Sequence, residues 1–247
     1  MEGHLERLRN ADFASIQRWL TPGARILELG GGSGYQANLM AARGFDVVSI
    51  DLQDRPKSQE AFFPVQDYDG RHIPFENASF DIVFSSNVLE HVRELPELLA
   101  ETRRVLKPGG IAIHLLPSAS WRFWTFLAHY IFVGKSVIGL QKPVPGMVSV
   151  TSPAQAIGKR GLAATLKKAI FQGPHGEYPN AFTELYYFSR FRWSRVFARN
   201  GFRIRVNSRN AIFYTGYALA PQLSLPTRQK LARLLGSSCH VFVMAPA

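Results

Sequence analysis

The stretch Ile26-Leu27-Glu28-Leu29-Gly30-Gly31-Gly32-Ser33-Gly34 decides the fold, because it joins an apolar strand to a helix through a glycine-rich turn. A doubly wound sheet binds its ligand at such a turn, where glycine lets the backbone approach closely. The dinucleotide pattern G-x-G-x-x-G is not completed, since position 35 is Tyr, and no G-K-S or G-K-T follows for a triphosphate. The turn therefore predicts a ligand site that is not built for a pyrophosphate.

Short apolar runs alternate with helical patterns along the chain, which is typical of a parallel sheet covered by helices. The predicted strands cover residues 24–29, 46–50, 61–66, 80–85, 111–116, 202–208 and 240–245. The predicted helices cover residues 5–16, 35–43 and 95–105, and a further helix is capped by Ser189 and ended by Gly201. The sequence thus predicts an α/β fold with a doubly wound, mostly parallel seven-stranded sheet and helices on both faces.

Charge is distributed unevenly along the 247-residue chain, whose formal net charge is +11. Residues 1–116 hold 12 Lys and Arg against 16 Asp and Glu, whereas residues 117–247 hold 17 against 2. A field of this sign attracts anionic partners such as phospholipid headgroups, nucleic acid or a phosphorylated intermediate, with solubility alone as the alternative. The single cysteine, Cys239, excludes an internal disulfide and zinc-type spacing, so a reducing compartment is expected. Residues 1–13 do not resemble a signal peptide.

Asp51 ends the second predicted strand, about 20 residues after the turn, where a carboxylate can accept hydrogen bonds from two vicinal ribose hydroxyls. The alternative is a solvated residue in a strand-end turn. Together with E-L-G-G-G-S-G and Asp51, the motifs Y-D-G-R-H-I-P-F, S-F-D-I-V-F-S-S-N-V-L-E-H-V and R-V-L-K-P-G-G resemble the class I S-adenosylmethionine-dependent methyltransferase family. The resemblance covers residues 20–117 in order and falls in the branch that acts mostly on small molecules and lipids. It implies a Rossmann-like fold and methyl transfer from S-adenosylmethionine.

The resemblance also implies which residues hold the cofactor. The methionine part is expected near the residues of the turn, Glu28, Gly30, Gly31, Gly32 and Gly34. Asp51 and the adjacent Leu52 are expected at the ribose. Asp69 resembles the acidic residue that reads the adenine amino group, with Asp67 as the competing candidate because it directly follows the third predicted strand. Asn87 is expected to line the cofactor through its backbone.

The implied chemistry asks the protein chiefly to align the acceptor and exclude water, because a sulfonium is already an activated methyl donor. No metal is required for this reaction, and no metal site is predicted. A hydroxyl acceptor would need a general base, for which His91 is the first candidate and a packing role the alternative. Glu177 and Glu184 are the only acids after residue 116, and with His175 they are candidates for acceptor binding or proton removal. The alternative for both acids is a structural salt bridge.

Residues 118–188 break the alternation and are predicted to form a long insertion after the fifth strand, with apolar helical stretches near Trp121–Val133 and Ala154–Phe171. The longest uncharged run in the first stretch, Phe123–Gly134, would span about 18 Å as a helix, against about 30 Å for a bilayer core. It can lie in a membrane interface, form a lid over an apolar acceptor, or be buried in the core. We therefore predict a single domain over 1–247, divided into a cofactor-binding half (1–117), an acceptor-binding or membrane-facing insertion (118–188) and a C-terminal helix with closing strands (189–247).

Three functions are compatible with these features. The first is methyl transfer to a small-molecule acceptor, namely a lipid, glycolipid or lipid-linked intermediate at an anionic membrane surface. The second is methylation of RNA or another nucleic acid, although Ser85-Ser86-Asn87-Val88 stands where an Asp/Asn-Pro-Pro-aromatic pattern would resemble base-amino methylation. The third is a non-catalytic, cofactor-binding partner subunit. The single cysteine predicts a cytoplasmic protein, and the first function adds a peripheral location on the inner face of the membrane. The sequence sets no oligomeric state.

Overall fold

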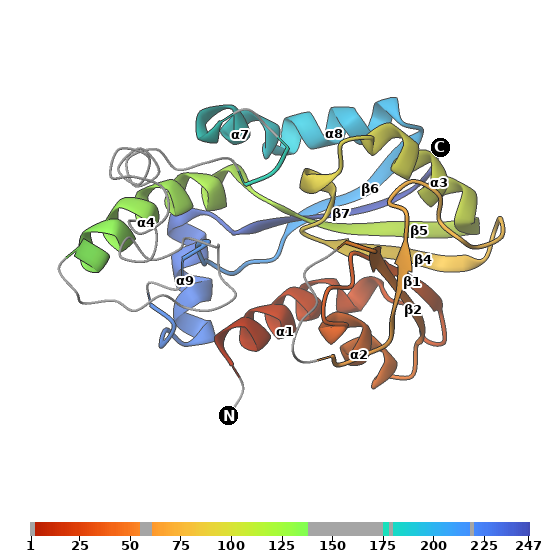
Figure 1. The fold of residues 1–247 in the computed structure, drawn as a ribbon, viewed down its shortest axis with the longest axis horizontal. Coiled ribbons are helices and arrows are strands. Elements are labelled where there is room, and N and C mark those ends of the chain that lie inside the picture. Colours follow the sequence, from red (N-terminus) through yellow and green to blue (C-terminus); the bar gives the residue numbers. More distant parts are fainter. Residues whose placement is uncertain (1–2, 55–60, 138–174, 178–179, 218–219) are drawn as a thin grey trace.

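The computed structural model describes residues 3–54, 61–137, 175–177, 180–217 and 220–247, which form a sheet with helices on both faces (Figure 1). The strands are β1 (Arg25–Leu29), β2 (Asp46–Leu52), β3 (Val65–Tyr68), β4 (Phe80–Ser86), β5 (Leu106–Pro117), β6 (Phe202–Arg209) and β7 (Cys239–Pro246). Their order across the 7-stranded sheet is β3-β2-β1-β4-β5-β7-β6. Neighbouring strands are parallel except at β7, which is antiparallel to both β5 and β6. The predicted fold class is confirmed.

The described α-helices are α1 (His4–Ile16), α2 (Tyr35–Ala41), α3 (Leu95–Val105), α4 (Ala119–Val137), α7 (Ala181–Tyr187), α8 (Arg190–Arg199) and α9 (Leu225–Leu235). Short 3-10 turns, η1 (Gln17–Trp19) and η2 (Leu89–His91), follow α1 and β4. The predicted cap of α8 is present, since the Ser189 hydroxyl accepts a hydrogen bond from the Arg192 N–H at 3.2 Å. Asn180 caps α7 in the same way, with its side chain accepting from two backbone N–H groups.

Two apolar clusters hold the helices on the sheet. On one face, α3 contributes Leu99 and α8 contributes Trp193 and Phe197, all fully buried. On the opposite face, α1 contributes Phe13 and α2 contributes Met40. Figure 1 shows α3 and α8 above the sheet and α1 and α2 below it. Because both faces are covered, a ligand reaches this kind of sheet from the edge formed by the carboxyl ends of its strands.

Some boundaries differ from those expected. β3 begins at Val65 rather than at residue 61. β5 begins at Leu106 rather than at residue 111, because Leu106 pairs with Phe80 and an irregularity in register after Phe80 keeps the Pro-Gly-Gly stretch in the strand. α9 was not expected, and it begins after Ser224, whose hydroxyl accepts from the Thr227 N–H at 3.3 Å. The helical stretch expected over 154–171 lies outside the described residues.

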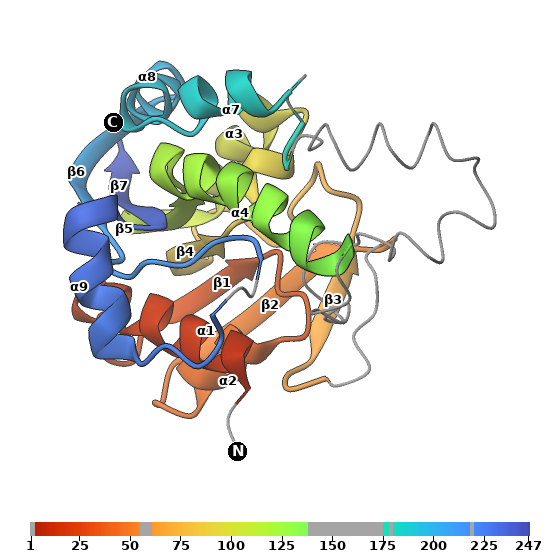
Figure 2. The same cartoon turned by 90° about the vertical axis from the view of Figure 1, so that its left-hand side faces the viewer.

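α4 follows directly on β5 and lies beyond the end of that strand (Figure 1). Figure 2 shows it between α7 on one side and α1 on the other. In the part of the chain that the structure describes, no helix is long and apolar enough to cross a membrane.

Candidate active site

The glycine turn lies at the carboxyl ends of β1 and β2. The N–H group of Gly31 donates to the carbonyl of Ile50 at 3.2 Å, so the turn folds onto the end of β2. A Cβ on Gly31 would collide with the Ser49 hydroxyl, and one on Gly34 would lie 2.6 Å from the carbonyl oxygen of Phe63. Gly34 also has a φ of +77°, which favours glycine. The turn is therefore tight on its protein side and tolerates no side chain there.

Asp51, at the end of β2, faces the turn. Its Oδ2 accepts a hydrogen bond from the Gly32 N–H at 2.7 Å, and its Oδ1 accepts one from the Leu52 N–H at 2.7 Å. A Cβ on Gly32 would meet no described atom within 4 Å, so this side of the turn is open. Each carboxylate oxygen can accept a further hydrogen bond. Asp51 and the open space beside Gly32 therefore provide a place where two hydroxyls can be bound.

Glu28 lies near the end of β1 and is buried beneath the turn. Its Oε2 accepts a hydrogen bond from the Ser49 hydroxyl at 2.6 Å and would lie 3.1 Å from a Cβ on Gly31. Burial raises the pKa of the Glu28 carboxyl to about 7, and the Ser49 bond opposes this shift. A carboxyl that can become charged near neutral pH, beneath an open turn, suits a cationic ligand.

A cavity of about 180 Å³ lies between α1, α4 and the segment 214–216. Its lining includes Asn87, which directly follows β4, together with Trp121 of α4 and His175. Asp12 of α1 also lines it, buried and accepting a hydrogen bond from Asn210 Nδ2 at 2.9 Å. Burial raises the pKa of Asp12 to about 6. Because β4 adjoins β1 in the sheet, this cavity is the candidate acceptor pocket.

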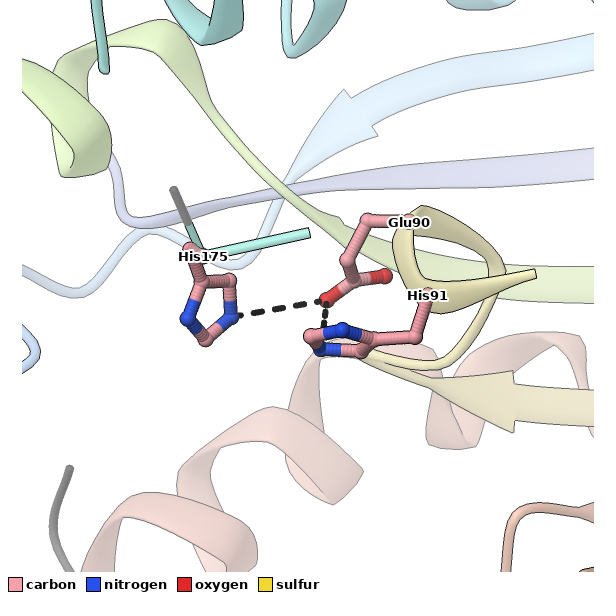
Figure 3. Close-up of side chains that lie close together, drawn as sticks. All are labelled: Glu90, His91 and His175. Carbon is pink, nitrogen blue, oxygen red and sulfur yellow. Dashed lines mark ion pairs between the residues drawn. The ribbon is translucent and has the colours of Figure 1, made fainter. Parts of the chain in front are cut away.

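His91 and His175 come together beside Glu90 (Figure 3). The ring centroids are 4.9 Å apart, and Glu90 Oε1 lies 3.8 Å from Nε2 of His91 and 4.0 Å from Nε2 of His175. Desolvation lowers the pKa of both rings, that of His175 to about 3. Burial raises the pKa of Glu90 to about 8. The two histidines, each singled out separately from the sequence, therefore share a site with a buried glutamate that the sequence analysis did not single out.

Residues 4–206 match the family model of the methyltransferase domain. The chain belongs to this family. Over 133 residues it is 32% identical to a ubiquinone/menaquinone biosynthesis C-methyltransferase from Ralstonia pickettii, a match that covers 49% of this chain and 54% of that protein. Over 96 residues it is 34% identical to a malonyl-acyl-carrier-protein O-methyltransferase from Serratia marcescens, covering 37% of this chain and 38% of that one. The chain thus spans about half or less of the length of these curated relatives.

A solved S-adenosylmethionine-dependent methyltransferase from Mesorhizobium loti has the same fold, with a TM-score of 0.53 and 15% identity over 95% of this chain and 97% of that one. The family match confirms the predicted methyltransferase family, and the Mesorhizobium loti structure confirms the predicted fold.

The residues of the turn fit S-adenosylmethionine. When bound, this cofactor supplies a methyl group that its positive sulfonium has already activated. The methyltransferase offers it an open side at Gly32, a buried carboxyl at Glu28 and two hydrogen-bond acceptors at Asp51. We propose that Glu28 and the turn hold the methionine part, that Asp51 holds the ribose hydroxyls, and that the exposed side chain of Leu52 lies beside the adenosyl group.

The two candidates for reading the adenine lie in different settings. Asp69 is exposed and already accepts hydrogen bonds from the N–H groups of Arg71 and His72, both at 2.8 Å, and these bonds lower the pKa of Asp69 to about 2. Asp67 lies in β3 in register with Asp51 of β2, so both belong to the same edge of the sheet. The register favours Asp67, while Asp69 shapes the following loop. Either assignment remains a prediction.

The two acids of the C-terminal half are engaged in ion pairs. Glu184 is buried and pairs with Arg122 at 2.6 Å, while Glu177 is near the surface and pairs with Arg93 at 2.7 Å. Glu184 Oε1 also accepts the backbone N–H groups of His175 and Gly176, both at 2.7 Å. Both acids therefore form the salt bridges that the sequence analysis gave as the alternative. Glu184 also positions His175, because it binds the backbone of that residue.

Asp12 and Glu90 were not singled out from the sequence. Asp12 lies on the apolar side of α1, between the buried residues Ala11 and Phe13, and a carboxyl in that setting is a signal the sequence carries. Glu90 stands next to His91 in the motif S-F-D-I-V-F-S-S-N-V-L-E-H-V, but only its complete burial distinguishes it from a solvated glutamate. Asn87 has a φ of +55°, a conformation that asparagine adopts more readily than most residues.

The raised pKa of Glu28 makes the stability of the methyltransferase depend on pH. The folded protein holds this proton up to about pH 7, whereas the unfolded chain releases it near the ordinary value of 4.5, so stability falls as pH rises between these values. Relative to Glu28→Gln, the wild type is expected to lose about 2 to 3 kcal/mol of unfolding free energy between pH 5 and pH 7. Urea unfolding of both proteins at several pH values, without cofactor, measures the difference. If the unfolding free energies of the two proteins changed in parallel with pH, the assigned burial of Glu28 would be contradicted.

Proposed function

We propose that this methyltransferase acts on an amphipathic acceptor, namely a lipid, glycolipid or lipid-linked intermediate, which it takes from an anionic membrane surface. The observation that carries the proposal is the reversed polarity of α4. This helix buries the polar residues Arg122, Thr125 and His129 beside the apolar Trp121 and Ala128. It also exposes several large apolar side chains, unlike a helix that packs its whole apolar stripe on a core.

The buried polar residues of α4 all have partners. Arg122 pairs with Glu184, as described above. The Thr125 hydroxyl accepts the N–H of Gly216 at 2.9 Å, and His129 Nδ1 lies 2.8 Å from the Tyr217 hydroxyl. Because these bonds fix the rotation of α4 about its axis, the apolar residues on the opposite side of the helix are held outward.

The outward face of α4 continues into an aromatic patch. Phe123, Leu127, Tyr130 and Ile131 of α4 are between 38% and 52% exposed. α4 contacts α7, on which Phe182 and Tyr186 are exposed, and Phe191 is exposed at the start of α8. Arg195 lies over the Phe191 ring, 5.2 Å from its centroid. Aromatic side chains beside cations suit the headgroup region of an anionic bilayer.

An apolar groove offers a place for the tail of such an acceptor. It has a volume of about 310 Å³, lies between α4, α9 and residues 213–217 and 220–223, and is lined by side chains that include Trp124, Leu127 and Phe213. Tyr214 and Thr215 line both this groove and the candidate acceptor pocket. A polar headgroup in the pocket could therefore extend an apolar chain into the groove.

A cluster of basic side chains lies away from the candidate acceptor pocket. A groove of about 450 Å³ is lined by Arg103, Lys107, Arg203 and Arg205, at the amino end of β5. That end of the sheet is opposite the acceptor pocket, so this groove gives no path for a nucleic-acid strand into the pocket. Methylation of a nucleic acid would instead appear as label in RNA when methyl-labelled cofactor is supplied to a cell extract.

Binding to vesicles tests the membrane part of the proposal. The wild type is expected to float with phosphatidylserine vesicles, and the variant Phe123→Ser/Leu127→Ser/Ile131→Ser to bind them at least about tenfold more weakly, because three inserting side chains lose their apolar surface. Leu234→Ser, which alters a leucine that is 82% exposed on α9, is the matched control and should bind like the wild type. Equal flotation of the triple variant and the wild type would contradict the proposed face.

The identity of the acceptor is tested separately with methyl-labelled cofactor and fractionated cell extract. Label is expected in the lipid or glycolipid fraction. Label confined to RNA would support nucleic-acid methylation instead, and label confined to water-soluble metabolites would remove the need for a membrane.

A further inference from the structure

We infer that Glu90, His91 and His175 form a binding site for a divalent transition-metal ion beside the acceptor pocket. The two histidines and the glutamate come from η2 and from the segment that precedes α7, which meet on opposite sides of the site (Figure 3). This departs from the sequence analysis, which predicted no metal site. It also assigns His91 and His175 a role other than that of a general base.

The spacing of the three donor groups suits a shared ion. One ligand atom from each residue lies within 4.8 Å of the others, and the two Glu90–histidine distances are 3.8 and 4.0 Å. Two atoms bound to the same ion are each about 2.1 Å from it, so they lie about 3 to 4 Å apart. Rotations that move each ring by less than about 1 Å bring the three donors to that distance.

Glu90 supplies the independent observation, because its buried carboxylate has no ordinary partner. The side chain is 0% exposed, and neither oxygen receives a hydrogen bond from any other described residue. Glu184 is equally buried, yet it has the Arg122 guanidinium and two backbone N–H groups. Leaving a buried carboxyl without donors is costly, and native proteins supply a partner or a metal in such cases. A cation beside Glu90 provides that partner.

The fold holds the third ligand in place. The Glu177 N–H donates to the carbonyl of Glu90 at 3.2 Å, and a Cβ on Gly176 would collide with the same carbonyl oxygen. On the other side, Glu184 binds the N–H groups of His175 and Gly176. His175 is therefore fixed against η2 by its backbone, as ligands of metal sites are fixed by the groups around them.

The donor set indicates the kind of ion. One carboxylate and two imidazoles suit Mn²⁺, Fe²⁺, Co²⁺ or Zn²⁺ and leave further coordination positions for other ligands. His175 also lines the acceptor pocket, so these positions adjoin the place where an acceptor would lie. A hard oxygen ligand, such as a hydroxyl of the acceptor, fits them.

The ion would favour methylation of an acceptor hydroxyl, a role that rests on the proposed function. Coordination lowers the pKa of a bound hydroxyl, so its proton can pass to water. The resulting alkoxide oxygen forms a bond to the methyl carbon as the carbon–sulfur bond breaks, and that electron pair stays on sulfur as a neutral thioether. The metal keeps its oxidation state, and no further reactant is needed.

Metal binding can be measured without the acceptor or a membrane, so its failure is distinct from failure of the proposed function. Purified full-length protein is titrated with Co²⁺, followed by visible absorption, and with Mn²⁺ and Zn²⁺ by calorimetry. One ion per chain is expected, with at least about 100-fold weaker binding in Glu90→Gln and in His175→Ala. Cofactor affinity and the unfolding temperature of each variant report whether it is folded. His175→Ala removes a partly exposed side chain and serves if Glu90→Gln does not fold.

His72→Ala is the matched control, since His72 is an exposed histidine that also pairs with an acid, Asp69, at 3.0 Å. It should bind the ion like the wild type. Absence of binding by the wild type, or an equal loss in the His72 variant and the His175 variant, would overturn the site. Full turnover after removal of metal by a chelator would overturn the role in methyl transfer.

Discussion

The Asp51→Ala variant is expected to bind S-adenosylmethionine roughly 100-fold more weakly than the wild type. Each hydrogen bond between a charged carboxylate and a ligand hydroxyl contributes about 1.5 to 3 kcal/mol, and the loss of two such bonds at the lower end of this range predicts an effect of this size. Asp51 also accepts the Gly32 N–H at 2.7 Å, and its removal frees the open part of the turn to move. Asp51→Asn keeps one acceptor oxygen and should fall between the two.

Calorimetric titration with the cofactor measures this change. The matched control is Asp46→Ala, which removes a carboxylate from the other end of β2, where Asp46 pairs with Arg25 at 3.3 Å on the surface. That variant should bind the cofactor like the wild type. An Asp51→Ala protein with unchanged affinity would show that the ribose is held elsewhere, and the assignment of the turn would have to be revised.

The parts of the methyltransferase that were predictable depend on short stretches of chain. A glycine turn after an apolar strand, and a carboxylate after the next strand, specify a doubly wound sheet by local pattern alone. The cap of α8 by Ser189 is equally local. The ends of the strands were less predictable. β5 begins at Leu106 only because Phe80 of β4 pairs with Leu106.

The candidate site around Glu90, His91 and His175 was predictable only in part, because its contacts join segments that are far apart in sequence. His91 and His175 could be singled out separately. Their ring centroids are 4.9 Å apart, however, only because residues 175–177 pack against η2. The burial of Glu90 follows from the same docking. The sequence left three roles open for the helix from Trp121 onward, and the outward direction of Phe123 depends on polar partners elsewhere in the chain.

Glu90 and Glu184 show how burial alone fails to distinguish structure from chemistry. Both carboxyls are 0% exposed, and burial raises the pKa of both. Glu184 is surrounded by donors that hold it in one geometry, whereas Glu90 faces two histidines, of which His175 lines the pocket. The first glutamate is therefore expected to act on stability and the second on ligand binding, which leads to opposite outcomes for the two Gln variants.

Glu184→Gln is expected to destabilise the methyltransferase by about 3 to 5 kcal/mol, because it leaves the Arg122 guanidinium, 1% exposed, as an uncompensated buried charge. For a chain of this length the unfolding temperature should fall by roughly 10 °C. The glutamine oxygen can still accept the N–H groups of His175 and Gly176, so the lost charge is the main change. Differential scanning calorimetry measures the effect.

Two further variants separate the buried charge from other causes. Arg122→Met/Glu184→Gln removes both charges and should recover most of the stability, since a neutral pair of similar volume needs no compensation. Arg93→Ala breaks the surface pair with Glu177 and should leave the unfolding temperature unchanged, because solvent already screens that pair. If the double variant were as unstable as Glu184→Gln, the loss would come from the packing of α4 on α7, and the outward direction of its apolar face would then depend on shape rather than on this ion pair.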